Sequence, residues 1–238
     1  MLDTLPRNFF QHAKNFFNPS TLQRLRKDLI KLETQVGTET ASEREKMAVY
    51  RGETPDAIRL DTRWLDLWRD NTQELLKLIR PFTWVIYPVQ VRHMRSSPQM
   101  VPWHQDLAFQ KALGTKAHSR VITVFVPLDE DPYRRSTVQF AEDKVLNYME
   151  HIPMNNFAAG LDGVDFKQLK HFQLQQGDCL VFGDYCPHRT FIPEGVEVER
   201  ATIEFRMIRP QDAIEDKDYF DIESGMFIRK DGTKRERP

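Results

Sequence analysis

Apolar residues in the first third of the chain recur at helical spacing. Near the N-terminus two pairs of aromatic residues lie seven positions apart and predict one helical face: Phe9, Phe10, Phe16 and Phe17. Apolar side chains then step by three and four through residues 22–36, which predicts an amphipathic helix. Residues 38–59 are polar and irregular, and they predict a loop. A second helical region covers about 62–80 and ends at Pro81, because proline cannot continue a helix.

From residue 82 onward the pattern changes to that of strands. Runs rich in β-branched and aromatic residues predict short strands at 83–87, 89–93, 120–128, 137–140, 179–182 and 201–208, with a further strand expected at His104. Residues 141–171 lack this alternation and predict a partly helical insertion. The short basic tail from Ile228 predicts a frayed, solvated terminus.

Helices first and short strands afterwards, without strand–helix–strand alternation, predict a mainly β fold with flanking helices. We expect one domain, 1–238, in three parts: a helical N-terminal region, 1–81, packed on a β-barrel or sandwich; the core, 82–208, with the insertion 141–171; and a C-terminal extension, 209–238. Side chains of a barrel alternate inward and outward, so ligands on neighbouring strands can converge in a shielded cavity.

Composition narrows the classes of function. The chain has 34 Lys and Arg against 35 Asp and Glu, so its net charge of −1 indicates neither nucleic acid nor an anionic membrane as a partner. No apolar run approaches the roughly 18–20 residues of a membrane span, and charges interrupt the N-terminal apolar stretch, unlike a signal peptide. Cys179 and Cys186 form no disulfide framework, which favours a cytoplasmic location and two small buried thiols.

The candidate chemistry lies in Trp103-His104-Gln105-Asp106 and in a distant histidine, His188. Residues i and i+2 of a strand point the same way, so His104 and Asp106 can hold one ion from one side. Seven His and 35 acidic residues in 238 give about one such pair by chance, so either histidine could equally be an ordinary surface residue. His188 follows a Gly-Asp turn and an apolar strand that delivers it to a rim. Two histidines and one carboxylate are the arrangement of non-haem Fe(II) oxygenases.

A second group of polar residues follows on the last strand. Arg200 and Thr202 share a strand face, as do Glu204 and Arg206. An arginine inside a barrel needs an anion to offset its desolvation, and a carboxylate matches its planar fork best. The alternative is an ordinary ion pair with a nearby glutamate: Glu197, Glu199 or Glu204.

These motifs, in this order, resemble the phytanoyl-CoA dioxygenase family of Fe(II)/2-oxoglutarate-dependent oxygenases, over about residues 84–208. The resemblance implies a double-stranded β-helix, or jelly roll. It implies Fe(II) held by His104, Asp106 and His188, and 2-oxoglutarate held by Arg200, with Thr202 beside it. Where the family has a Gly-Ser-His turn, this chain departs from the pattern. Weaker assignments place Gln90 at the co-substrate and three residues at the substrate: Arg92, Trp103 and Arg206. Arg206 is also the main rival of Arg200.

The resemblance implies that O2 oxidises a small or carrier-bound organic substrate, with release of succinate and CO2. Halogenating relatives have a small residue in place of the carboxylate, so Asp106 favours hydroxylation. Two alternatives stay open: a cupin-like metal enzyme that does not use 2-oxoglutarate, and a catalytically silent jelly-roll binding protein. Cupins usually supply more histidines, and the retained ligands disfavour a silent protein.

Residues 38–59, 93–101 and 141–171 are expected to border the cavity, with 38–59 and 141–171 more mobile than the strands.

Overall fold

The computed structural model describes residues 6–36, 56–70, 72–95, 100–108, 120–143, 147–154 and 157–236. Its larger sheet is antiparallel and orders its strands as β1 (Phe10–Ala13), β9 (Cys179–Gly183), β4 (Val121–Pro127), β11 (Arg200–Ile208), β2 (Trp84–Tyr87), β12 (Asp218–Asp221), β13 (Met226–Ile228) and β14 (Lys234–Arg235). A further strand, β3 (Gln90–Met94), also pairs with β11. The smaller sheet consists of β10 (His188–Phe191), β5 (Thr137–Ala141) and β8 (Leu169–His171), and a separate pair consists of β6 (Ile152–Met154) and β7 (Phe157–Gly160).

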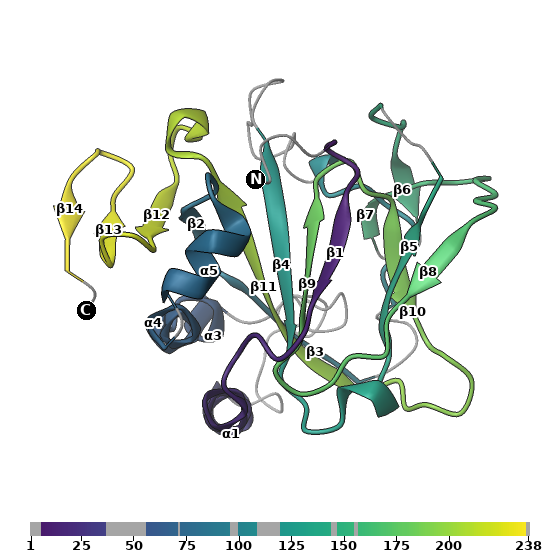
Figure 1. Cartoon of the computed structure of the whole chain (residues 1–238), viewed down its shortest axis with the longest axis horizontal. Coiled ribbons are helices and arrows are strands. Elements are labelled where there is room, and N and C mark those ends of the chain that lie inside the picture. The colour runs from purple at the N-terminus through teal and green to yellow at the C-terminus, as the bar shows by residue number, and fades with distance from the viewer. Residues whose placement is uncertain are drawn as a thin grey trace.

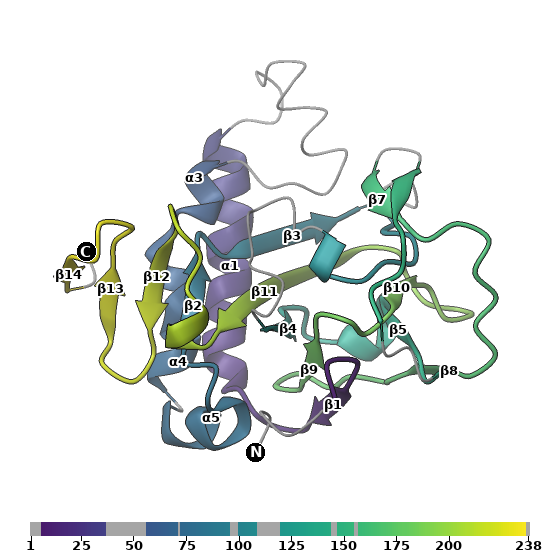
Figure 2. The ribbon, with the colours of Figure 1, turned by 90° about the horizontal axis from the view of Figure 1, so that it is seen from above.

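The helices cover one face of the larger sheet, and the smaller sheet lies on its other side (Figure 1). These helices are α1 (Pro19–Val36), α3 (Asp56–Arg59), the 3-10 turn η2 (Thr62–Leu65), α4 (Asp66–Arg69) and α5 (Thr72–Ile79). The long helix α1 runs past β3 and β11 when the molecule is seen from above (Figure 2). Two further 3-10 turns are η4 (Pro132–Arg134) and η5 (Pro210–Asp212). No helix among the described residues is long and apolar enough to cross a membrane.

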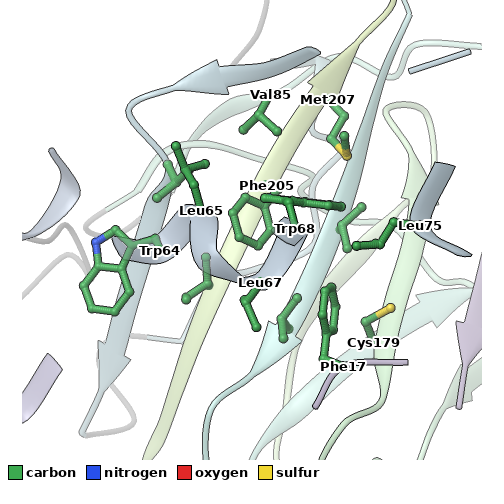
Figure 3. Close-up of a cluster of buried hydrophobic side chains, with 14 of the residues drawn as sticks. Phe17, Trp64, Leu65, Leu67, Trp68, Leu75, Val85, Cys179, Phe205 and Met207 are labelled. Atoms are coloured by element: carbon green, nitrogen blue, oxygen red, sulfur yellow. The ribbon is translucent and has the colours of Figure 1, made fainter. Parts of the chain in front are cut away.

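The main core fills the space between the helices and the larger sheet. On β11 every second residue faces it: Ala201, Ile203, Phe205 and Met207. Trp68 of α4 meets Phe205 edge to face, with ring centroids 4.7 Å apart (Figure 3). Both side chains are essentially unexposed, and burial of each large apolar side chain stabilises the fold by about 1.5–3 kcal/mol. The alternation predicted for the last strand is therefore the pattern that docks the helices.

A second core lies between the two sheets. Its members come from both of them: Phe125, Val138, Phe140, Leu174, Leu180, Phe182 and Cys186. Strand β9 is therefore buried on both faces, which explains its continuous apolar run. Both cysteines are free and buried, as predicted, and burial raises the pKa of each thiol.

The helix predicted around the four N-terminal phenylalanines is wrong. Residues Phe10–Ala13 form β1, which pairs with β9 so that Phe10 lies opposite Phe182. The ring of Phe10 stacks on Phe140 at 4.7 Å, while Phe9 faces the helix-side core. The strand covers an otherwise open edge of β9, and this pairing outweighs the local helical spacing. Helix α1 begins only at Pro19.

The other predicted elements divide into confirmed and corrected ones. The strands at 83–87, 89–93, 120–128, 137–140, 179–182 and 201–208 are present within a few residues as β2, β3, β4, β5, β9 and β11, and the second helical region is split into η2, α4 and α5. The predicted loop 38–59 lies outside the described residues as far as 55, and its last four residues are helix α3.

Two further expectations need correction, on the insertion and on the tail. The described part of the insertion 141–171 contains strands β6, β7 and β8 and no helix. The tail is not frayed from Ile228, because β13 and β14 pair with each other. Strand β12 pairs with β2, so the C-terminal extension 209–238 widens the larger sheet. These segments are strands because neighbouring strands supply their ladder hydrogen bonds. The residues of the segments alone do not show which strands will lie beside them.

The N-terminal segment passes close to Gly183, the last residue of β9, and a substitution at this glycine tests that close approach. A Cβ at this position would collide with the carbonyl oxygen of Arg7 and lie 3.2 Å from the Phe9 ring. We expect Gly183→Ala to lower the free energy of unfolding by about 3 kcal/mol, since backbone atoms must move. Gly195→Ala is the control, because it has open space and only a positive φ to strain, at a cost of about 1 kcal/mol. Urea unfolding measures both; equal losses would contradict the close crossing.

Candidate metal centre

One antiparallel bridge brings the two sequence-distant histidines together. The amide of His104 donates to the carbonyl of His188 at 3.0 Å, and the amide of His188 donates to the carbonyl of His104 at 2.9 Å. Directly opposed residues of such a pair project to the same face, and the ring centroids lie 4.1 Å apart. His188 opens β10, whereas the strand predicted at His104 is reduced to this single bridge.

Backbone carbonyls fix the tautomer of both imidazoles. Nδ1 of His104 lies 2.8 Å from the oxygen of Pro102, and Nδ1 of His188 lies 2.9 Å from the oxygen of Cys186. A carbonyl only accepts, so each Nδ1 carries the hydrogen and each Nε2 keeps a lone pair. Both Nε2 atoms face Oδ1 of Asp106, at 3.7 and 3.8 Å. Burial lowers the pKa of His188 to about 3, so this ring is neutral, as a metal ligand must be.

The carboxylate of Asp106 is buried and ionised. Burial alone would raise the pKa of Asp106, but the charge of Arg206 beside it holds that pKa well below its usual value. The hydroxyl of Thr123 donates to Oδ2, and Nη2 of Arg206 donates to Oδ1 at 3.1 Å. Thr123 and Arg206 lie directly opposite each other in the β4–β11 register, so the sheet aims both donors at one carboxylate.

The three predicted ligands form one site. Ligand atoms of His104, Asp106 and His188 all lie within 4.8 Å of one another, and no other such group of His, Cys, Asp or Glu occurs among the described residues. All three side chains are buried. Two imidazoles that present Nε2 and one ionised carboxylate suit a divalent transition-metal ion and leave further coordination positions open. The donor set therefore fits Fe(II).

Arg200 and Thr202 lie on the same inner face of β11 as the residues that reach the metal site. Arg200 is buried; its Nη1 donates to the carbonyl of Thr137 at 2.7 Å and its Nη2 to Oγ1 of Thr190 at 3.3 Å. Burial lowers the pKa of Arg200 to about 10, which leaves the guanidinium charged at neutral pH. In the described chain no carboxylate forms an ion pair with Arg200. The alternative of an ordinary ion pair with Glu197, Glu199 or Glu204 therefore does not occur, since these glutamates pair with other residues.

Two threonines close to Arg200, one that accepts from it through its carbonyl and one two positions along β11, have hydroxyls that lack a hydrogen bond in the described chain. Oγ1 of Thr202 and Oγ1 of Thr137 are both buried without a hydrogen bond among the described residues. Buried polar groups are normally paired, so a buried cation without a counter-anion and two unpaired hydroxyls are groups that an anionic ligand would satisfy. This arrangement fits the distal carboxylate of 2-oxoglutarate, and it adds Thr137 to the predicted pair of residues.

Glu204, which the sequence did not single out as a site residue, joins three residues that it did. Its Oε1 forms an ion pair with Nε of Arg92 at 3.3 Å, and its Oε2 accepts from Nη1 of Arg206 at 3.1 Å. With its amide turned to satisfy both groups, Gln90 donates to the same Oε2 at 3.2 Å. The sequence does contain a pattern that could have identified Glu204 as a site residue, because every second position of this otherwise apolar strand is polar. The roles of Gln90, Arg92 and Arg206 at co-substrate or substrate stay predictions.

Trp103 makes its contacts away from the polar cluster of Gln90, Arg92, Glu204 and Arg206. Its ring stacks under the guanidinium of Arg189 at 4.7 Å and meets Phe166 at 4.9 Å. It lines a hollow of about 360 Å³ together with Met100, Leu161 and Phe191. A substrate role for Trp103 is untested by these contacts and stays a prediction.

Gln105, between the two ligands of the His-x-Asp motif, fastens part of the insertion to the metal site. Its side chain donates to the carbonyls of Asn147 at 3.1 Å and Tyr185 at 2.8 Å, and it accepts from the amide of Met149 at 2.7 Å. Its own amide donates to Nε2 of His151 at 2.8 Å. A fully buried glutamine thus holds residues 147–151 beside the ligands.

No protein-family model and no curated protein sequence matches the chain. Solved structures do resemble it. A non-heme monooxygenase, ThoJ in its apo form, is 16% identical over 90% of this chain and 81% of that chain, with a TM-score of 0.57. The non-heme α-ketoglutarate-dependent epimerase SnoN from nogalamycin biosynthesis is 13% identical over 90% of this chain and 80% of that one, also with a TM-score of 0.57.

A third structure, EvdO2 from Micromonospora carbonacea var. aurantiaca complexed with 2-oxoglutarate, is 15% identical over 84% of this chain and 86% of that chain, with a TM-score of 0.53. The chain therefore has the double-stranded β-helix fold of non-haem 2-oxoglutarate oxygenases, as predicted. At these identities the likeness establishes the fold. The buried His-Asp-His triad inside that fold is a finding of this structure itself.

Gln105→Ala tests how firmly residues 147–151 are held. Loss of one side-chain hydrogen bond costs about 1 kcal/mol, so the amide of Met149 should exchange with solvent roughly fivefold faster or more. Hydrogen exchange followed by mass spectrometry measures this. Gln173→Ala, at an exposed glutamine, is the matched control and should leave 147–151 unchanged. Equal exchange in both variants would show that Gln105 does not fasten the segment.

Proposed function

We propose that the chain is an Fe(II)- and 2-oxoglutarate-dependent dioxygenase that hydroxylates a C–H bond of a small or carrier-bound organic substrate. The observation that carries the proposal is the pairing of two features in one barrel. A buried triad of two imidazoles that present Nε2 and one ionised carboxylate shares the barrel with a buried arginine, Arg200, which has no carboxylate partner in the described chain. The order of the motifs supports a place near the phytanoyl-CoA dioxygenase family.

The neighbouring structures support the same choice of cofactor. SnoN is recorded in complex with Fe3+ and α-ketoglutarate, and EvdO2 with 2-oxoglutarate. In this chain His104, Asp106 and His188 would hold Fe(II), and Arg200 with Thr202 and Thr137 would hold the distal carboxylate of 2-oxoglutarate. With co-substrate and O2, Fe(II) supplies an oxidation of unactivated C–H bonds that leaves succinate and CO2 as products.

The residues of the chain itself supply positioning and shielding. The carbonyls of Pro102 and Cys186 hold both imidazoles in the tautomer that presents Nε2. The rings of Phe182 and Phe140 lie 4.6 and 6.1 Å from the His188 ring and keep water from that side. Asp106 occupies the position that would have to be small for a halide to bind, so hydroxylation is favoured over halogenation.

Anaerobic titration with Fe(II) and 2-oxoglutarate tests the proposal directly. We expect the weak visible charge-transfer band of an Fe(II)–keto-acid chelate in the unaltered chain. His104→Ala, Asp106→Ala and His188→Ala should each abolish stoichiometric Fe(II) binding without unfolding the protein, because the site is mounted on two packed cores. Arg189→Ala should keep the band. A folded, iron-loaded chain without the band would favour a cupin-like enzyme or a silent binding protein instead.

Arg200 separates an oxygenase that uses 2-oxoglutarate from other metal-binding jelly rolls. Arg200→Ala should weaken 2-oxoglutarate binding at saturating metal by roughly 30-fold to several-thousand-fold, the equivalent of about 2–5 kcal/mol for one partner of a buried charge pair. Arg200→Lys should recover part of this loss, because an ammonium lacks the two-pronged contact. Thr202→Ala should cost only about 1 kcal/mol. An effect of Arg206→Ala without one of Arg200→Ala would transfer the role to Arg206.

A further inference from the structure

The oxygen of Asp106 that faces the two imidazoles is also bound to an arginine. Oδ1 lies 3.7 Å from Nε2 of His104, 3.8 Å from Nε2 of His188 and 3.1 Å from Nη2 of Arg206. The other oxygen, Oδ2, accepts the hydroxyl of Thr123. A metal ion held by this triad would therefore share Oδ1 with a guanidinium, and two positive charges would act on the same atom.

Arg206 in turn lies between two carboxylates. Its Nη1 donates to Oε2 of Glu204 at 3.1 Å, and Glu204 is 8% exposed. Glu204 lies two positions before Arg206 on β11, so both side chains enter the barrel from the same face. Glu204 is not among the ligand atoms that could hold the metal. The guanidinium of Arg206 thus connects Asp106, a predicted metal ligand, with Glu204, a carboxylate outside the predicted ligand set.

Buried charges require a counterion, because removal from water is costly and is repaid only by close, well-aligned partners. Without a divalent ion, Arg206 supplies the positive charge that Asp106 needs. Once a metal ion is bound, the metal ion supplies the positive charge that Asp106 needs. The charge of Arg206 then repels the metal ion unless Glu204 neutralises Arg206. Water screens these interactions weakly at a buried site, so both effects should change the metal dissociation constant.

We propose that Arg206 is the built-in counterion of the metal-free site: it keeps Asp106 aimed at His104 and His188, and Glu204 neutralises it once a divalent metal ion binds. The inference rests on the metal site of the proposed function and assigns two positioning residues to it. Arg206 stabilises the metal-free chain and weakens metal binding, whereas Glu204 strengthens metal binding. The two residues therefore act on the same equilibrium with opposite sign.

Titration of the full chain with Co(II), without 2-oxoglutarate, measures both effects by calorimetry and by the visible bands of bound Co(II). Arg206→Met removes the charge and keeps an unbranched side chain; it should bind Co(II) about tenfold more tightly or better. Glu204→Gln should bind Co(II) about tenfold more weakly or worse, since Arg206 is then unbalanced. The double variant should lie between the two. Arg206→Met should also lower the thermal midpoint of the metal-free chain more than that of the Co(II)-loaded chain.

Two variants control for packing. Arg206→Lys keeps the charge and should bind Co(II) nearly as the unaltered chain does. Arg92→Met removes a cation that pairs with Glu204 but, among the described residues, forms no ion pair with Asp106; its effect on Co(II) binding should be smaller than that of Arg206→Met. If metal-free Arg206→Met does not fold, the direction of the Glu204→Gln change decides the outcome.

Weaker Co(II) binding by both Arg206→Met and Glu204→Gln would overturn the inference, since a packing defect gives the same sign at both positions. An unchanged affinity in Glu204→Gln would also overturn it. Failure of the unaltered chain to bind Co(II) would contradict the metal site and with it the proposed function. Retained binding with the wrong sign would remove only the role of Arg206 and Glu204.

Discussion

Strand β11 is buried on both faces, and the charges on its inner face constrain the rest of the barrel. Its outer residues, such as Phe205, dock the helices, whereas Arg200, Glu204 and Arg206 point inward. A buried charge is tolerated only beside a partner. The register of β3 places Gln90 opposite Glu204, and the register of β4 places Thr123 opposite Arg206, so that both reach the same carboxylate of Asp106. A slip of one residue would turn the charges toward the helices, so the chemistry of the inner face also fixes the sheet.

The three candidate metal ligands are held in place differently from the charged residues on the inner face of β11. His188 begins a strand, and the carbonyl of Cys186 orients its ring. His104 and Asp106 lie in a segment with one bridge and are oriented by the carbonyl of Pro102 and the hydroxyl of Thr123. Such supports hold ligands in place before a metal arrives, which lowers the ordering cost of binding. The rigid sheet therefore supplies the electrostatic surroundings, and the short bridged segment supplies the ligands.

The sequence predicted what depends on local pattern and missed what depends on register. Alternating apolar runs located β4, β9 and β11, and the His-x-Asp spacing with a distant histidine located the triad. Strand β1 was mistaken for a helix because its pairing with β9 is invisible in residues 9–17 alone. The contacts of Thr123 and Glu204 escaped for the same reason. A threonine in an apolar strand becomes a partner of Asp106 only once β4 and the ligand segment are placed in space.

Arg200 and Arg206 illustrate why position on a shared face does not determine the role of an arginine. They lie six residues apart on β11, and both enter the barrel. Arg206 bonds to two carboxylates, and these raise its pKa even though burial lowers it. Arg200 bonds only to a carbonyl and a hydroxyl in the described chain, so burial prevails and its pKa falls. A charge already neutralised by the protein has little to gain from an anionic ligand, whereas a desolvated cation without a counter-anion gains the most. The electrostatic difference between the two side chains, rather than their spacing from His188, therefore favours Arg200 as the one that receives a carboxylate.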